Sequence, residues 1–344
     1  VYGGAEEGCY LCGHPDVDEV HITGSNTTYE AILFGPGEEG ARRKAQRRPL
    51  LDKPFSGELG TVAPVIIVPG AWSEKEMQTQ ADRLVLWMTA NAGFLCATPR
   101  VIVQWAGWKQ RQEFNEAIAR TLAREKTRKA FYPGAFERQA QFLNEHPGAQ
   151  QFGDVGEGCL PWTFIPGVDA RDVDNICFKN ESFCGVLAET AVAAPDFFSY
   201  LENAVQFANE VLWGNLNSTL IVHPNCLKKQ PMATAVDRAV ADLRTGMVLV
   251  NQSAAFAYLI CTTTWGAFPG NDIYDLQSGF GVTGNALMFD RPQKSVVTGP
   301  FTLALDPLTV HSRNIHDTCR KLVDVQYRPS LANVSSMLWS AVRS

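Results

Sequence analysis

Two short stretches of the sequence carry side chains that could act together in covalent catalysis. The stretch "ANAGFLCATP" contains Cys96, and the stretch "SGELGTVAP" contains Glu58 between two glycines. A thiolate is a strong nucleophile, and a carboxylate that acts through one water is an effective general base. Each residue also has an ordinary explanation, because free cysteines are usually buried and inert and a carboxylate between glycines is typical of a turn.

A third stretch, "HITGSNTTYEAI", has the pattern of a phosphate-binding turn. An apolar strand ends near Thr23, Gly24 and Ser25 follow, and a helix is predicted from about Thr27. The free N–H groups and the dipole at the start of such a helix favour an anion. A tight turn without a ligand is the competing interpretation, since Gly and Ser are common turn residues.

The other polar clusters do not indicate a metal or a nucleic acid. Cys9 and Cys12 form a C-x-x-C pair, but no second pair lies at a spacing that would complete a zinc site, so no metal site is predicted. The basic run "ARRKAQRR" follows Glu38 and Glu39 and is predicted to be the solvated end of a helix. The net charge of −6 argues against a general surface for nucleic acids.

The composition is typical of a globular protein, with 45% hydrophobic and 19% charged residues in 344 positions. The nine cysteines are scattered and odd in number, which favours a reducing compartment, and we expect the cytoplasm. No apolar run has the length of a membrane span, so no membrane association is expected. The first residues lack the features of a signal peptide and resemble the interior of a domain.

Short apolar runs alternate with amphipathic ones, which predicts an α/β architecture with a largely parallel sheet. The predicted strands span residues 17–23, 64–68, 100–104, 219–223 and 247–251. The predicted helices span residues 75–90, 111–124, 136–144, 200–213 and 232–244.

Over residues 1–300 these pieces resemble the aldehyde dehydrogenase superfamily. Seven of the family's motifs recur in the same order. The first three are TGS at 23–25, ELG at 58–60 before a proline at 64, and N-x-G-x-x-C at 91–96. The other four are E-x-F at 181–183, Asn209 with Gly214, G-x-V-x-V-N at 246–251, and S-G-x-G at 278–281 after Phe268 and Gly270. Each motif is weak alone, but together they are far more specific. The resemblance implies an aldehyde dehydrogenase-like α/β fold, with a partial Rossmann-type coenzyme domain and a catalytic domain built on a parallel sheet.

The resemblance also implies an activity, namely NAD(P)-dependent oxidation of a small aldehyde to a carboxylic acid. In that chemistry Cys96 would be the nucleophile that forms a thiohemiacetal and then a thioester, and Glu58 would be the general base. The backbone N–H of Cys96 could donate to the developing oxyanion. Relatives usually form homodimers or homotetramers, so we expect the same assembly.

The cofactor implied by the resemblance is NAD or NADP. Glu181 would hold the nicotinamide ribose with Phe183 beside it, Gly24 and Ser25 would lie near the pyrophosphate, and Gly60 would line the same site. The expected domains are the remainder of the coenzyme domain at 1–60, the catalytic domain at 61–281, and a return to the coenzyme domain with a C-terminal extension at 282–344. On this comparison the chain lacks the N-terminal part of the family fold, including the oxyanion-hole asparagine.

Departures from the family pattern suggest a divergent, bacterial-like subgroup. Phe94 replaces a glutamine, Thr61 replaces a glycine, and Tyr29 stands where a glycine is usual and could alter the fit of the cofactor. Three alternatives remain open: an inactive relative kept for binding or assembly, a cysteine hydrolase that pairs Cys96 with a histidine, and a plain binding module. The pocket walls are expected to include Trp162, Trp265 and Phe268.

Overall fold

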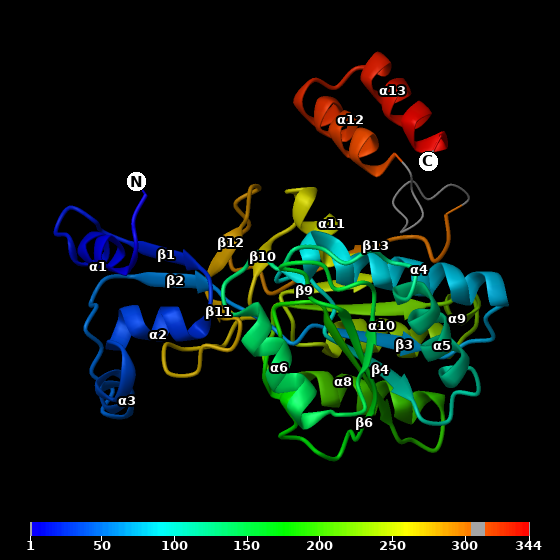
Figure 1. Cartoon of the computed structure of the whole chain (residues 1–344), viewed down its shortest axis with the longest axis horizontal. Helices are drawn as coiled ribbons and strands as arrows, with labels where there is room; N and C mark the ends of the chain where they lie inside the picture. The colour runs from blue at the N-terminus through cyan, green and yellow to red at the C-terminus, as the bar shows by residue number, and fades with distance from the viewer. Residues whose placement is uncertain (1, 304–313, 344) are drawn as a thin grey trace.

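An eight-stranded sheet dominates the computed structural model, which describes residues 2–303 and 314–343 (Figure 1). Its order is β13-β9-β8-β3-β4-β7-β6-β5, and every neighbouring pair is parallel except β5 with β6. The strands are β3 (Pro64–Val68), β4 (Val101–Trp105), β5 (Gln150–Phe152), β6 (Trp162–Val168), β7 (Val186–Val192), β8 (Asn217–Val222), β9 (Met247–Val250) and β13 (Ser295–Thr298).

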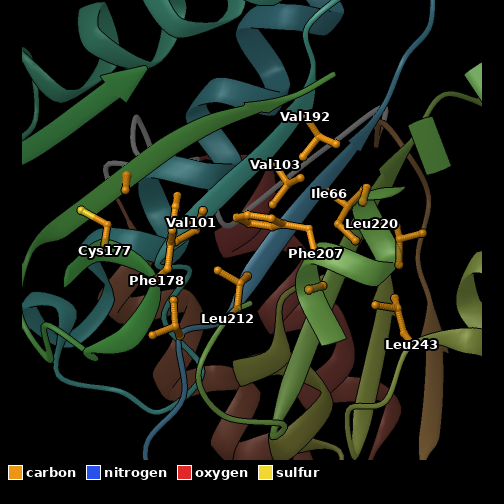
Figure 2. Packing of buried hydrophobic residues seen from close by; sticks show 14 of the residues in the cluster. Ile66, Val101, Val103, Cys177, Phe178, Val192, Phe207, Leu212, Leu220 and Leu243 are labelled. Atoms are coloured by element: carbon orange, nitrogen blue, oxygen red, sulfur yellow. The ribbon is translucent and has the colours of Figure 1, made fainter. Parts of the chain in front are cut away.

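Helices cover both faces of this sheet, which explains why its central strands are apolar throughout. Val65 and Ile67 of β3 pack with α4 (Glu74–Thr89) and α5 (Arg111–Leu122) in one core cluster. Ile66 and Val68 pack with α8 (Phe197–Glu210) and α10 (Met232–Asp242) in another. Figure 2 shows Phe207 of α8 among strand residues of this second core.

A three-stranded sheet forms a separate, smaller unit near the N-terminus (Figure 1). Its strands are β1 (Val20–Thr23), β2 (Phe55–Glu58) and β11 (Gly279–Phe280), and its helices are α1 (Ala5–Gly13), α2 (Asn26–Phe34) and α3 (Gly37–Ala45). Strands β1 and β2 are parallel and are joined through α2 and α3, while β11 is antiparallel to β2. A strand, a helical crossover and a parallel strand are the Rossmann-type unit, here in partial form.

The remaining elements connect or flank these two sheets. They are the 3₁₀ turn η1 (Ala90–Gly93), α6 (Ala135–Glu145), α7 (Ile176–Lys179), α9 (Pro224–Leu227), α11 (Ala254–Leu259), β10 (Trp265–Gly266), β12 (Val282–Gly284), α12 (Ile315–Tyr327) and α13 (Leu331–Val342). Helices α12 and α13 pack against each other and lie away from both sheets (Figure 1). In the ranges that the structure describes, no helix has the length and apolarity needed to cross a membrane.

The predicted elements are confirmed to within a few residues. The largest difference is at α8, which begins three residues earlier and ends three residues earlier than the predicted range of 200–213. The basic run lies at the end of α3, where Arg42 and Arg43 pair with Glu39, as a solvated helix end should. Cys9 and Cys12 lie in helix α1 as free thiols.

The division into domains at 1–60, 61–281 and 282–344 stays a prediction, and strand pairing adds detail to it. The chain rejoins the small sheet at β11, where Gly279 is the register partner of Glu58. It then returns to the large sheet, because β13 pairs with β9. Residues 295–298 therefore belong with the larger sheet, and residues 304–313 of the predicted C-terminal segment lie outside the described residues.

Candidate active site

A cavity of about 720 Å³ lies where the small sheet meets the large one. The seven residues expected from the sequence to act in catalysis or to bind the cofactor all line it: Gly24, Ser25, Glu58, Gly60, Cys96, Glu181 and Phe183. Its other lining residues are Thr23, Asn26, Thr27, Leu59, Phe94, Leu95, Tyr132, Arg138, Lys179, Asn180 and Trp213. The motifs "TGS", "ELG", "NAGFLC" and "ESF" therefore meet in one place.

Parallel pairing in the small sheet brings the first two motifs together. Thr23 at the end of β1 is the register partner of Glu58 at the end of β2, and the Gly24 amide donates to the Glu58 carbonyl at 3.1 Å. Parallel strands end at one edge of a sheet, so the residues that follow them share that edge. Ser25 caps α2 by accepting a hydrogen bond from the Thr28 amide, which aims the first turn of the helix at the cavity.

A left-handed turn at the end of α4 directs Cys96 into the cavity. Asn91, Ala92 and Gly93 have φ values of 51°, 57° and 82°. The buried Arg100 stabilises this nucleophile loop, residues 91–96, by donating a hydrogen bond to the Gly93 carbonyl at 2.9 Å. The Cys96 carbonyl accepts from the side chain of Asn217 at 3.1 Å.

Cys96 and Glu58 line the same cavity, close enough for the carboxylate to affect the thiol. Burial raises the pKa of the Cys96 thiol well above its ordinary value, and the negative charge of Glu58 raises it further. Glu58 is only 4% exposed, and its Oε1 accepts no hydrogen bond within the described part of the chain. Glu58 is thus placed to receive the thiol proton. No histidine lines the described cavity, so the cysteine–histidine alternative lacks its imidazole.

Glu181 lies at the back of the cavity beside the cysteine loop. Its Oε1 lies 3.6 Å from Arg100 Nη2. Burial nonetheless raises the pKa of Glu181 from 4.5 to about 7. Gly60 makes room for this carboxylate, since a Cβ at that position would lie 2.1 Å from Glu181 Oε2.

The pH dependence of stability follows from this buried carboxyl. Between pH 4.5 and about 7 the folded protein holds a proton on Glu181 that the unfolded chain releases, so the free energy of unfolding falls as pH rises through that range. We expect Glu181→Gln to flatten this slope in urea titrations. Glu157→Gln, at an exposed position, should leave the slope unchanged. Equal slopes in wild type and Glu181→Gln would contradict the prediction.

The turn before Cys96 should tolerate no side chain at Gly93. An added Cβ would lie 2.7 Å from the Cys184 carbonyl, and the positive φ is itself unfavourable for other residues. We expect Gly93→Ala to lower the free energy of unfolding by roughly 1–3 kcal/mol, measured with urea. Gly148→Ala is the control, because nothing lies within 4 Å of its added Cβ. Equal stability of the two variants would argue against a strained turn.

Several lining residues lie outside any motif that the sequence revealed. Tyr132 precedes α6, Arg138 lies in its first turn, and Lys179 ends α7. Charged and aromatic residues in connecting segments were the only available signal, and that signal is shared by most surface loops.

The expectations for four aromatic residues need correction. Trp162 and Trp265 are buried in core clusters and do not line the cavity, and Phe268 is also absent from its described lining. Tyr29 is fully buried within the small unit, where its ring stacks on Phe55 and its hydroxyl donates to the Phe55 carbonyl at 2.5 Å. It fills the space between α2 and the sheet instead of facing the cavity.

The described residues contain no group of three or more histidine, cysteine or acidic side chains placed to hold a metal ion. No protein-family model matches the sequence, and no curated protein resembles it at a significant level.

The fold does match solved structures. An oxidoreductase from Marinobacter aquaeolei superposes with a TM-score of 0.60 at 20% identity, covering 83% of this chain and 54% of its own. A mutant of aldehyde dehydrogenase C from Pseudomonas syringae, solved with NAD⁺ and octanal, gives 0.59 at 20% identity, with 81% and 52% covered. A glyceraldehyde-3-phosphate dehydrogenase from Methanocaldococcus jannaschii, solved with NADP, gives 0.59 at 18% identity, with 82% and 54% covered. This chain spans about half the length of those proteins, and over that span it has the aldehyde dehydrogenase fold.

Proposed function

We propose that this chain carries the nucleophile and the general base of an NAD(P)-dependent aldehyde dehydrogenase. The observation that carries the proposal is the meeting of Cys96 and Glu58, 38 positions apart in the sequence, as lining residues of one cavity, where Glu58 Oε1 has no hydrogen-bond partner within the described residues. The aldehyde dehydrogenase fold of the chain supports the same conclusion. The substrate would be a small aldehyde and the product a carboxylic acid.

The reaction would begin with transfer of the Cys96 proton to Glu58. The thiolate then attacks the aldehyde carbon, a C–S bond forms, and the oxygen becomes an alkoxide that the Cys96 amide could stabilise. A bound nicotinamide would supply the acceptor for the hydride that this carbon loses as the thioester forms. Glu58, after releasing the thiol proton to solvent, would take a proton from a water that attacks the thioester. The C–S bond then breaks, the carboxylic acid leaves, and Glu58 returns this proton to the Cys96 thiolate.

The residues of the cavity fit a nicotinamide nucleotide. The first turn of α2 offers backbone N–H groups to an anion such as a pyrophosphate. Glu181 Oε1 is buried beside Arg100 at 3.6 Å and accepts no hydrogen bond within the described residues, so it could accept one from a ribose hydroxyl. Gly24, Ser25 and Phe183 complete this side of the cavity. NAD and NADP are both compatible with these contacts.

A catalytically inactive protein with a binding or assembly role is the second candidate. The raised pKa of the Cys96 thiol favours it, because a resting thiol is a poor nucleophile until Glu58 removes its proton. The two candidates differ in one respect: an inactive relative would bind the nucleotide without reducing it in the presence of any aldehyde.

The deciding experiment measures NADH or NADPH formation across a panel of aldehydes, with the protein expressed together with any upstream coding sequence. Reduction with at least one aldehyde supports the enzyme, and nucleotide binding without reduction supports the inactive alternative. Light scattering on the same sample tests the proposed homodimer or homotetramer. Fractionation of cells tests the proposed cytoplasmic location.

A further inference from the structure

The wall of the cavity formed by residues 181–184 has no regular secondary structure of its own. It connects the end of α7 at Lys179 to the start of β7 at Val186. Phe183 has a φ of 40°, a conformation that costs free energy for any residue with a side chain. Such a backbone persists only where its surroundings hold it.

Two arginines hold this wall from different elements. Arg138 of α6 donates through Nε to the Ser182 carbonyl at 2.9 Å and through Nη2 to the Phe183 carbonyl at 3.2 Å. Arg100 donates to the Cys184 carbonyl at 2.7 Å and to the Ser182 hydroxyl at 3.4 Å. A planar guanidinium can satisfy neighbouring carbonyls in this way because its N–H groups point in fixed directions.

Arg138 also fixes the aromatic side of the cavity. Its Nη1 donates to the Pro133 carbonyl at 2.9 Å, just before α6 begins, and its guanidinium lies 6.0 Å from the Tyr132 ring centre. The Tyr132 ring in turn meets the Phe183 ring edge to face, with centres 4.9 Å apart. In the part of the chain that the structure describes, no carboxylate pairs with Arg138, so its contacts are those to carbonyls and to an aromatic face.

The two arginines differ in their reach. Arg100 also donates to the carbonyls of Gly93 and Leu95, and so holds the nucleophile loop as well as the wall. Within the described residues Arg138 makes no hydrogen bond to that loop, and it meets the loop only through the rings of Tyr132 and Phe183, whose centres lie 5.8 and 6.0 Å from that of Phe94. We propose that Arg138 is a positioning residue for the nicotinamide nucleotide, which orients Phe183 and Glu181 toward the cavity without acting on Cys96. This inference rests on the proposed function.

The test compares Arg138→Lys and Arg138→Gln with wild type. Lysine keeps the positive charge but cannot donate to the three carbonyls that the guanidinium reaches. Glutamine loses both the charge and these hydrogen bonds. We expect each variant to weaken NAD(P)⁺ binding by about tenfold or more, measured by quenching of tryptophan fluorescence with Trp213 in the cavity as reporter. The KM for the nucleotide should rise more than kcat falls, and amide hydrogen exchange should increase at residues 181–185.

Alkylation of Cys96 by iodoacetamide without nucleotide should stay within about twofold of wild type, since the hydrogen bonds that hold its loop come from Arg100 and not from Arg138. Arg128→Gln is the matched control, because Arg128 is half exposed and pairs with Glu125 outside the cavity. If Arg138→Gln does not fold, the same measurements on Arg138→Lys decide the question.

Wild-type affinity in a folded Arg138 variant would overturn the inference, as would a loss of Cys96 alkylation equal to the loss of binding. These outcomes require a wild-type protein that binds nucleotide. Failure of the wild type itself to bind would instead overturn the proposed function.

Discussion

We expect Cys96→Ser to lower the rate of aldehyde oxidation by roughly a thousandfold or more. A serine hydroxyl in this cavity has no base that can ionise it as readily as Glu58 ionises a thiol, and alcohols are far weaker nucleophiles at neutral pH. The measurement is steady-state formation of NAD(P)H with saturating aldehyde. Nucleotide affinity should change little, because Cys96 does not hold the cavity wall at 181–184.

Cys261→Ser is the control for this substitution, because Cys261 is exposed and lies outside the cavity lining. It should retain wild-type activity. Comparable turnover by Cys96→Ser and wild type would show that another group is the nucleophile.

Glu58→Gln is expected to have two effects of opposite sign. It removes the proton acceptor in both the attack by Cys96 and the hydrolysis of the thioester, so aldehyde oxidation should fall by about 10²- to 10⁴-fold. At the same time, loss of the negative charge lowers the pKa of the Cys96 thiol. The thiolate fraction at neutral pH then increases, and alkylation of Cys96 by iodoacetamide becomes faster.

Rates of alkylation and of turnover are measured on the same preparation, together with the urea stability of each variant. Glu157→Gln, at an exposed position outside the cavity, should change neither rate. A Glu58→Gln protein that is slow in both assays would contradict an effect of the Glu58 charge on the thiol. One that keeps full turnover would remove Glu58 from the mechanism.

Local sequence patterns were sufficient for most of the fold. The run "PVIIV" predicts a strand buried on both faces, and residues 64–68 are that strand. Helix α4 begins after Ser73, whose capping box with Glu76 is visible in the sequence. Helix α2 was predicted from about Thr27 and begins at Asn26, because Ser25 caps it by accepting a hydrogen bond from the Thr28 amide.

The positions of the candidate site residues along the chain could also be predicted, but not their energetics. The order of the motifs pointed to Cys96 and Glu58. Whether the pKa of the thiol rises or falls depends on its burial and on a carboxylate carried by the small sheet. Tyr29 illustrates the same limit, because its place in a motif suggested the cofactor while packing turned it toward Phe55.

The sequence by itself determined the elements and the types of side chain available for chemistry, because helix caps, apolar periodicity and turn residues act over a few neighbouring positions. Only the tertiary structure decided which of them meet. The register of β1 with β2 sets Thr23 beside Glu58, and Arg100 and Arg138 find carbonyl partners more than forty residues away. Contacts over such separations, and the loss of water around them, arise from packing of the whole chain and have no local signature.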